Sequence, residues 1–93
     1  MTVELRVIVS YNVDRRRASE TSMVYQFVFG RKVTRKLASG RKVYRYPGLI
    51  DRTEAEALGQ SVVMLREKDA DEFTSFLWNL RVPCTARRVW VEI

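Results

Sequence analysis

The sequence predicts an α+β fold in a single domain covering residues 1–93, with a small, mostly antiparallel β-sheet, a long basic β-hairpin and a C-terminal β-α-β unit. Three patterns lead to this prediction. Apolar residues alternate with polar ones near both ends of the chain, as in half-buried strands. Two basic runs flank a turn at Ser39-Gly40, and apolar residues recur at helical spacing within residues 69–81. One main helix packed on one sheet face is the simplest arrangement of these elements, and it leaves the other face partly open.

The first third of the chain is predicted to hold two strands joined by a loop. Residues 2–13 form the first strand, because apolar residues occupy every second position on its buried face. Residues 14–22 show no apolar periodicity and predict an exposed loop that begins with three arginines after Asp14. Residues 23–29 are β-branched and aromatic, which favours a second strand. Gly30 would then mark a bulge where this strand continues.

A β-hairpin is predicted next, with residues 31–37 pairing with residues 41–46. Ser39-Gly40 is a turn signal between these two strand-like runs, and Pro47-Gly48 closes the hairpin. We treat the tetrapeptide Gly-Arg-Lys-Val, which occurs at 30–33 and 40–43, as chance similarity between two basic strands.

The segment after the hairpin predicts a short helix and a strand. The helix covers residues 51–58, with Asp51 as N-cap, Glu54 at the third helical position and Gly59 at its end. A continuous apolar run within residues 61–66 predicts a central strand buried on both faces.

The longest helix has the clearest pattern in the sequence. Asp69 is predicted to be its N-cap, and Glu72 to complete a capping box. Apolar side chains follow at i, i+3, i+4 and i+7: Phe73, Phe76, Leu77 and Leu80. Pro83 stops the helix, and residues 85–93 predict a last strand. The strand, the helix and the last strand form a right-handed crossover with adjacent or near-adjacent parallel strands.

Cysteine usage and hydropathy predict a cytoplasmic protein without a membrane partner. Cys84 is the only cysteine, whereas a small secreted domain would usually carry several disulfide-bonded pairs. The sequence contains no run near the roughly 20 apolar residues of a membrane-spanning helix. Its first residues carry Glu4 and Arg6 instead of an apolar signal region.

Charge is distributed unevenly along the chain. Residues 1–52 hold twelve Lys/Arg and four Asp/Glu, a net charge of +8, whereas residues 53–93 hold five and seven, a net charge of −2. A positive field over one part of a molecule attracts polyanions. Thirteen of the seventeen basic residues are arginine, which forms forked contacts with phosphate and stacks on bases.

The sequence predicts no catalytic activity, metal or cofactor. Histidine, the commonest general acid–base, is absent. The clustered carboxylates, Glu54 with Glu56 and those within residues 69–72, lie at predicted helix N-termini, where capping explains them. With one cysteine the chain offers no zinc site, and it has no glycine-rich phosphate-binding motif. A nuclease that uses carboxylates and a divalent ion is the remaining enzymatic alternative.

The end of the first predicted strand, Tyr-Asn-Val-Asp-Arg-Arg at residues 11–16, resembles the opening of the small ribonucleases of CRISPR adaptation. That family has a strand-end Asp where this sequence has Asn12. The family also continues into a helix, where this sequence predicts a loop. The resemblance is therefore not used to assign a function.

The basic hairpin is the candidate functional site. Residues 31–46 contain seven Lys/Arg, no Asp/Glu and two interleaved tyrosines. Basic side chains neutralise phosphates and release counterions, and aromatic faces stack on unpaired bases. Residues 15–17 would add a second basic patch. The predicted nucleic-acid-binding residues are Arg15, Arg16, Arg17, Arg31, Lys32, Arg35, Lys36, Arg41, Lys42, Tyr44, Arg45 and Tyr46.

Two other interpretations of the hairpin remain open. Lys and Arg also protect exposed strands from edge-to-edge pairing, in which case the hairpin is only a solvated surface. The same charge would also suit an acidic surface on a protein partner.

The sequence thus predicts a small nucleic-acid-binding protein that contacts mainly the phosphate backbone. RNA is favoured over DNA, and the predicted role is structural, within a ribonucleoprotein such as the ribosome. The alternative is a non-catalytic accessory subunit of a DNA replication or repair complex, or of another protein complex. Such a subunit would use the open sheet face or Trp78 and Trp90, because aromatic side chains are common anchors at interfaces.

Overall fold

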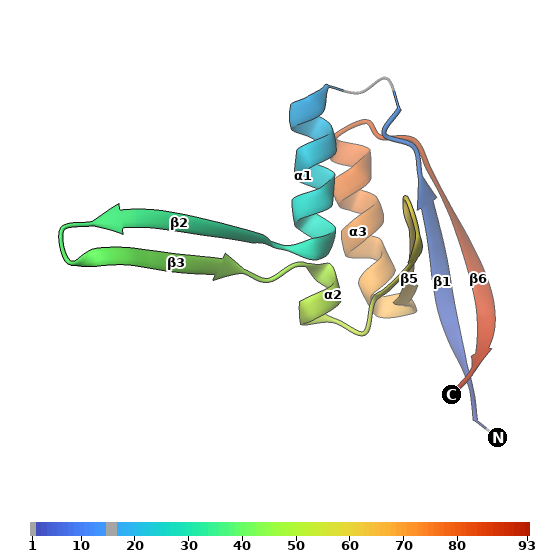
Figure 1. The fold of residues 1–93 in the computed structure, drawn as a ribbon. Coiled ribbons are helices and arrows are strands. Elements are labelled where there is room, and N and C mark those ends of the chain that lie inside the picture. The colour runs from blue at the N-terminus through green and yellow to red at the C-terminus, as the bar shows by residue number, and fades with distance from the viewer. Residues whose placement is uncertain (1, 15–16) are drawn as a thin grey trace.

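The computed structural model describes residues 2–14 and 17–93, which form a body of one β-sheet with its helices and a projecting β-hairpin (Figure 1). The body contains a four-stranded sheet in the order β4-β5-β1-β6, while β2 and β3 form a separate two-stranded sheet. The elements follow one another as β1 (Val3–Tyr11), α1 (Ala18–Phe29), β2 (Arg31–Leu37), β3 (Gly40–Tyr46), α2 (Leu49–Arg52), β4 (Glu56–Gly59), β5 (Val62–Arg66), α3 (Glu67–Asn79) and β6 (Cys84–Glu92). The predicted α+β class, antiparallel sheet and hairpin are confirmed.

Strand β1 lies at the centre of the sheet and pairs antiparallel with both β5 and β6. Strands β5 and β6 are therefore parallel to each other with β1 between them, which confirms the predicted β-α-β unit with near-adjacent strands. Without β2, β3 and the single turn α2, the order of the elements is that of a split β-α-β unit, β-α-β-β-α-β. The hairpin is thus an insertion between α1 and α2.

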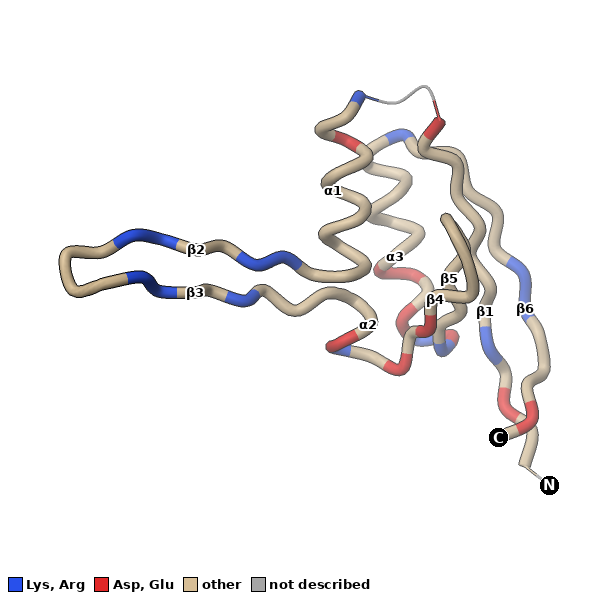
Figure 2. The backbone as a smooth tube through the Cα atoms, viewed as in Figure 1, with Lys and Arg blue, Asp and Glu red and all other residues tan. Residues whose placement is uncertain are grey.

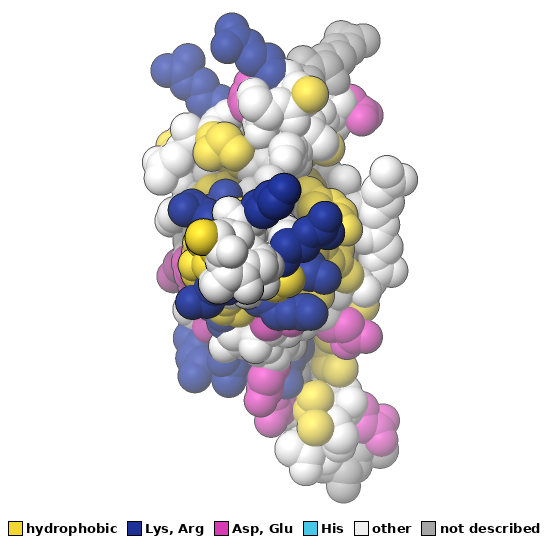
Figure 3. All heavy atoms as spheres, turned by 60° about the vertical axis from the view of Figure 1, so that its left-hand side comes forward, with side chains coloured by type: hydrophobic (Ala, Val, Ile, Leu, Met, Phe, Trp, Pro, Cys, Tyr) yellow, Lys and Arg dark blue, Asp and Glu magenta, His cyan; other side chains and the backbone are white. Residues whose placement is uncertain are grey.

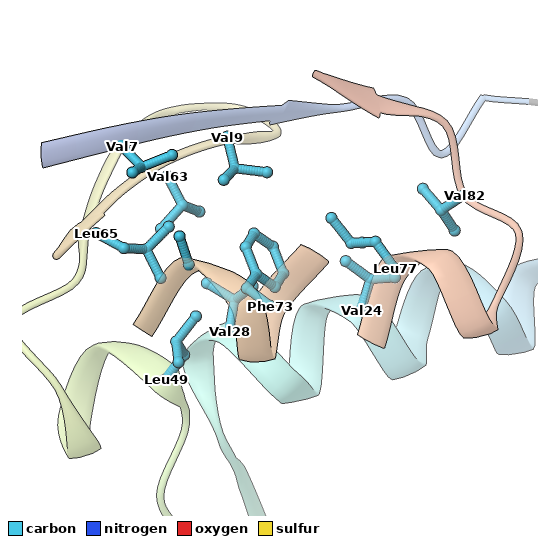
Figure 4. Close-up of a cluster of buried hydrophobic side chains, with 11 residues drawn as sticks. Val7, Val9, Val24, Val28, Leu49, Val63, Leu65, Phe73, Leu77 and Val82 are labelled. Atoms are coloured by element: carbon cyan, nitrogen blue, oxygen red, sulfur yellow. The ribbon is translucent and has the colours of Figure 1, made fainter. Parts of the chain in front are cut away.

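The hydrophobic core lies between the sheet and the helices α1 and α3, which cover the same sheet face (Figures 1 and 4). Phe73 and Leu77 of α3 are fully buried, as the helical spacing predicts. On β5, Val63 and Leu65 are buried and the alternate residues only half-buried, so this central strand is not buried on both faces as predicted. The core residues are Val7, Val9, Val24, Val28, Leu49, Val63, Leu65, Ala70, Phe73, Leu77 and Val82.

Helix α1 covers residues 18–22 of the predicted loop and the whole strand predicted for residues 23–29, while residues 15–16 of that loop lie outside the described residues. Val24 and Val28, one helical turn apart, are both buried against the core. Phe27 stacks on Phe76 of α3, with ring centroids 4.0 Å apart. The preference of aromatic and β-branched residues for strands depends on context, and here burial at helical spacing overrides it.

Gly30 is the C-terminal end of α1, not the predicted strand bulge. Its φ is 84°, a conformation that glycine adopts without strain, and its N–H donates to the carbonyl oxygen of Gln26 at 2.8 Å. A helix therefore follows the first strand, where the sequence predicted a loop, so the predicted loop is not a difference from the CRISPR ribonucleases. The other difference, Asn12, remains.

The short helix predicted for residues 51–58 is only the single turn α2. The backbone N–H of Gly48 donates to Asp51 Oδ2 at 2.9 Å, so that Asp51 is the third helical residue and not the N-cap. Residues 56–59 form the edge strand β4 instead of the rest of the helix.

The acidic residues at the start of α3 bind arginines instead of capping the helix. The N-cap of α3 is Arg66, and its Nε donates to Asp69 Oδ2 at 2.8 Å. Glu72 accepts a hydrogen bond from Arg52 at 2.9 Å. Charge-assisted bonds of this kind are stronger than bonds to neutral donors. The predicted capping box is therefore wrong, although the helix itself is confirmed, with its N-cap three residues earlier and its end about two residues earlier than predicted.

Candidate nucleic-acid interface

The hairpin of β2 and β3, called here the arm (residues 31–46), extends away from the body (Figure 1). Seven residues per strand give it a length of about 24 Å. The radius of gyration is 15.6 Å, against about 12 Å for a compact chain of this length. The structure describes the whole arm, and only Val33 and Tyr44 in it are half-buried, while every other residue is exposed. The arm is therefore open to a partner on both of its faces.

The register of the arm divides its side chains into two faces. Leu37 pairs with Gly40 across a two-residue turn, and Arg31 pairs with Tyr46 at the other end. Residues directly opposite each other lie on the same face, and successive residues alternate between faces. The aromatic face carries Arg31, Val33, Arg35, Leu37, Lys42, Tyr44 and Tyr46. The basic face carries Lys32, Thr34, Lys36, Arg41, Val43 and Arg45.

The two tyrosines of the arm are covered by cations. The guanidinium carbon of Arg31 lies 4.5 Å from the ring centroid of Tyr46. Arg35 and Lys42 lie 5.7 Å and 5.2 Å from the ring centroid of Tyr44. Such cation–π contacts are attractive, so the tyrosines orient the basic side chains. In this geometry, the role of the tyrosines is to position cations rather than to stack directly on bases.

The net charge of the arm is larger than the net charge of the whole protein, which is +6, and its Lys and Arg residues lie along both strands (Figure 2). It holds seven of the seventeen Lys/Arg and none of the eleven Asp/Glu, so its charge is +7. The rest of the chain holds ten Lys/Arg and eleven Asp/Glu, a net charge of −1. Within residues 2–14 and 17–93, no cation of the arm forms an ion pair, whereas body arginines pair with nearby carboxylates: Arg6, Arg52, Arg66 and Arg88.

Three cross-strand pairs of the arm place like charges directly opposite each other. These pairs are Lys32 with Arg45, Arg35 with Lys42, and Lys36 with Arg41. Like charges in this position destabilise a β-ladder, and an isolated two-stranded hairpin is only marginally stable in water. Protection against edge-to-edge pairing requires charge on the arm, but it does not require cations opposite cations. A local arrangement that costs stability is expected at a functional site.

Gly30 and Gly48 form the neck, the place where the two ends of the arm join the body. A Cβ on Gly48 would overlap with the backbone nitrogen of Gly30 and the carbonyl carbon of Phe29. The two chain segments at the neck are therefore in backbone contact, which leaves no room for larger residues. A cleft of about 510 Å³ opens at this neck, with Arg31 and Arg45 in its lining.

Of the predicted N-terminal basic patch, residues 15–17, the structure describes only Arg17, which it does not bring to the arm. Arg15 and Arg16 lie outside the described residues. Arg17 precedes α1 at the end remote from the arm (Figure 1). A helix of twelve residues is about 18 Å long, so Arg17 and the arm are distinct surfaces. The other nine predicted residues all lie on the arm, and the sequence pattern did not reveal that six of them oppose one another in like-charge pairs.

Outside the arm, Tyr11 packs against the hydrophobic core. Burial raises the pKa of the Tyr11 phenol, whose ring packs edge-on against Phe73 with centroids 5.5 Å apart. Among the described residues, no three His, Cys, Asp or Glu side chains cluster as a metal site would require. No helix in the part of the chain that the structure describes is long and apolar enough to cross a membrane.

Comparisons of the chain with models of protein families, with curated proteins and with solved structures find no match. The assignment of the interface therefore depends on the geometry and charge of the arm.

Proposed function

We propose that this protein binds nucleic acid through the arm, with structured RNA as the favoured ligand and contacts mainly to the phosphate backbone. The observation that carries the proposal is a charge of +7 on an exposed hairpin whose cations include three like-charge pairs and form no ion pair with a carboxylate of residues 2–14 and 17–93. The proposed role is structural, in a cytoplasmic ribonucleoprotein such as the ribosome.

Phosphate groups would relieve the repulsion that the arm has by itself. A phosphate beside Lys36 and Arg41, or beside Arg35 and Lys42, would interact favourably with both cations of the pair. Neutralisation of the nucleic acid releases its condensed counterions, which supplies most of the affinity of non-specific binding. The body has a net charge of −1, so the field of the protein would direct the arm toward a polyanion.

Folded RNA suits a projecting arm because its phosphate backbones approach one another from several directions. Proteins recognise such RNA largely by shape and by contacts with phosphates and sugars. A protein that contributes a 24 Å arm in this way needs no base-specific contacts, in agreement with the absence of a recognised RNA-binding motif.

The first test is fluorescence anisotropy with labelled structured RNA, single-stranded DNA and duplex DNA over a series of salt concentrations. We expect the tightest binding to structured RNA and a log–log salt slope of about −4 to −6, which corresponds to roughly five to seven engaged phosphates. Absence of binding to all three ligands at low salt would contradict the proposal.

A pair of variants then assigns the binding to the arm. The arm variant combines Arg35→Gln, Lys36→Gln, Arg41→Gln and Lys42→Gln. Its control removes four exposed cations of the body: Lys68→Gln, Arg81→Gln, Arg87→Gln and Arg88→Gln. Both lose four positive charges, yet only the arm variant should show a salt slope shallower by about three to four. Neutralisation removes two like-charge pairs but also the two cations over the Tyr44 ring, so circular dichroism of both variants is needed to show that the arm remains folded. Equal affinities of the two variants would show that the arm is not the site.

A second candidate function is that of a non-catalytic accessory subunit of a replication, repair or other protein complex. Trp78 at the end of α3 is 79% exposed and Trp90 on β6 is 72% exposed, as anchors for a protein partner would be. Trp78 is near the C-terminal end of α3, which a short connection joins to Cys84 at the start of β6. Trp90 is six residues, about 20 Å, further along β6 from Cys84. They therefore form two separate anchors. Binding to a partner protein that persists in molar salt would favour this function.

A further inference from the structure

The cations of the arm are distributed over both of its faces. Arg31, Arg35 and Lys42 lie on the aromatic face. Four others lie on the basic face: Lys32, Lys36, Arg41 and Arg45. Figure 3, in which the arm points toward the viewer, shows Lys and Arg side chains gathered around its end on more than one side. The arm therefore presents positive charge in two opposite directions.

Both faces are accessible for their full length. The half-buried pair, Val33 and Tyr44, lies within the aromatic face, and the basic face has no buried residue. Within the described chain, neither face receives a carboxylate from the body. Both faces thus present exposed cations to a polyanion.

The two-sided distribution restricts the geometry of the ligand. A single strand, or the outer surface of one backbone, would lie along one face and leave three or four cations on the other face unused. Charges that are exposed and directly opposed destabilise the arm, so the unused face would carry this cost without compensation. A ligand with phosphates on both sides of the arm would engage both sets of cations.

We infer that the arm binds between two phosphate backbones, so that its ligand is paired nucleic acid with an open groove and not a single strand. The inference rests on the proposed function and specifies its ligand. The major groove of B-DNA, about 12 Å wide, admits a two-stranded ribbon, whereas the major groove of a regular RNA helix is deep and narrow. For RNA, the site is therefore an internal loop or a junction, where the groove is widened.

Two matched variants test the inference. The aromatic-face variant combines Arg31→Gln, Arg35→Gln and Lys42→Gln. The basic-face variant combines Lys32→Gln, Lys36→Gln and Arg41→Gln, so that each substitution has a neighbour in the other variant one position away along the chain. Lys68→Gln, Arg81→Gln and Arg87→Gln in the body provide a control with the same charge change. Binding is measured by anisotropy against an RNA with an internal junction, a continuous RNA duplex, a single-stranded RNA and a DNA duplex.

We expect each face variant to bind the junction RNA at least about tenfold more weakly at moderate salt, with a salt slope shallower by about two to three. The body control should bind as the wild type does. A loss confined to one face variant would overturn the two-sided inference and leave the proposed function intact. Full affinity in both face variants would overturn the proposed function, and the inference with it.

The ligands provide a second, independent test. The wild-type protein should bind the junction RNA more tightly than the single strand of equal length and the continuous RNA duplex. A single strand bound as tightly as the junction would overturn the inference. Equal binding of the continuous RNA duplex would overturn the requirement for a widened groove. Tightest binding to duplex DNA would support two backbones and overturn the preference for RNA.

Discussion

Gly30 and Gly48 hold the arm at a fixed place on the body. The φ of Gly48 is −89° with ψ at 179°, an extended conformation that any residue adopts. Its neighbours nevertheless exclude a side chain, because a Cβ would lie 2.5 Å from the carbonyl oxygen of Val28 as well as against Gly30. The requirement for glycine at position 48 is therefore steric and not conformational.

Gly48→Ala should destabilise the protein by about 1–3 kcal/mol, because the new methyl group can be accommodated only by moving backbone. Gly59→Ala is the control, since a Cβ on Gly59 would meet nothing within 4 Å. Urea unfolding followed by circular dichroism measures both. If the two variants were equally stable, the close approach of the two segments at the neck would be wrong.

At the scale of the element, the arm combines weak internal stabilisation with strong repulsion. Its stabilising contacts are the Val33–Tyr44 pair and the cations over the two tyrosine rings. Opposing them are the three like-charge pairs, each of which costs some tenths of a kcal/mol. We therefore expect the amide protons of the arm to exchange faster than those of the central strand β1, since local stability varies across a structure.

Arg41→Glu should change stability and binding in opposite directions. The substitution converts the repulsive pair with Lys36 into an attractive one, so the arm should become more stable by about 0.5–1 kcal/mol and its amide exchange slower. RNA binding should weaken, because one cation is lost and a negative charge is added. Arg41→Gln separates the two effects, since it removes the repulsion without adding attraction. Exchange that is no slower in the Glu variant than in the wild type would contradict the cross-strand register.

At the scale of the whole molecule, the arm is separate from the core that stabilises the protein. The core residues come from β1, α1, β5 and α3, together with Leu49 and Val82, and none belongs to the arm. The Phe27 ring stacks with the rings of Phe76 and Phe73, at centroid distances of 4.0 Å and 5.9 Å, which joins α1 to α3. The body thus has its own complete two-layer packing.

Replacement of residues 31–46 by a short glycine-serine turn should leave a folded body. The chain ends at the excision are already adjacent, since Gly30 lies against the backbone of Gly48. We expect a melting temperature within a few degrees of the wild type, a net charge of −1 and no RNA binding. Calorimetry and anisotropy measure these properties. Unfolding of the shortened chain would show that the arm stabilises the body.

Periodicity and charge in the sequence were enough to determine much of this protein. Alternation with period two located β1 and β6, and the spacing of Phe73 and Leu77 located α3. The turn signal at Ser39-Gly40 located the arm, and composition showed that its side chains are basic. These properties depend on neighbours along the chain, so a local pattern is sufficient to predict them.

The tertiary structure decided the rest, because it depends on partners distant in the sequence. Helix α1 forms where strand propensity predicted a strand, because Val24 and Val28 become buried in a core built from residues distant in the sequence. The partners of the carboxylates are arginines from other elements, such as Arg52 for Glu72. The exact opposition of the cations, and with it their division between two faces, follows from the strand register, where a shift of one residue would exchange the faces.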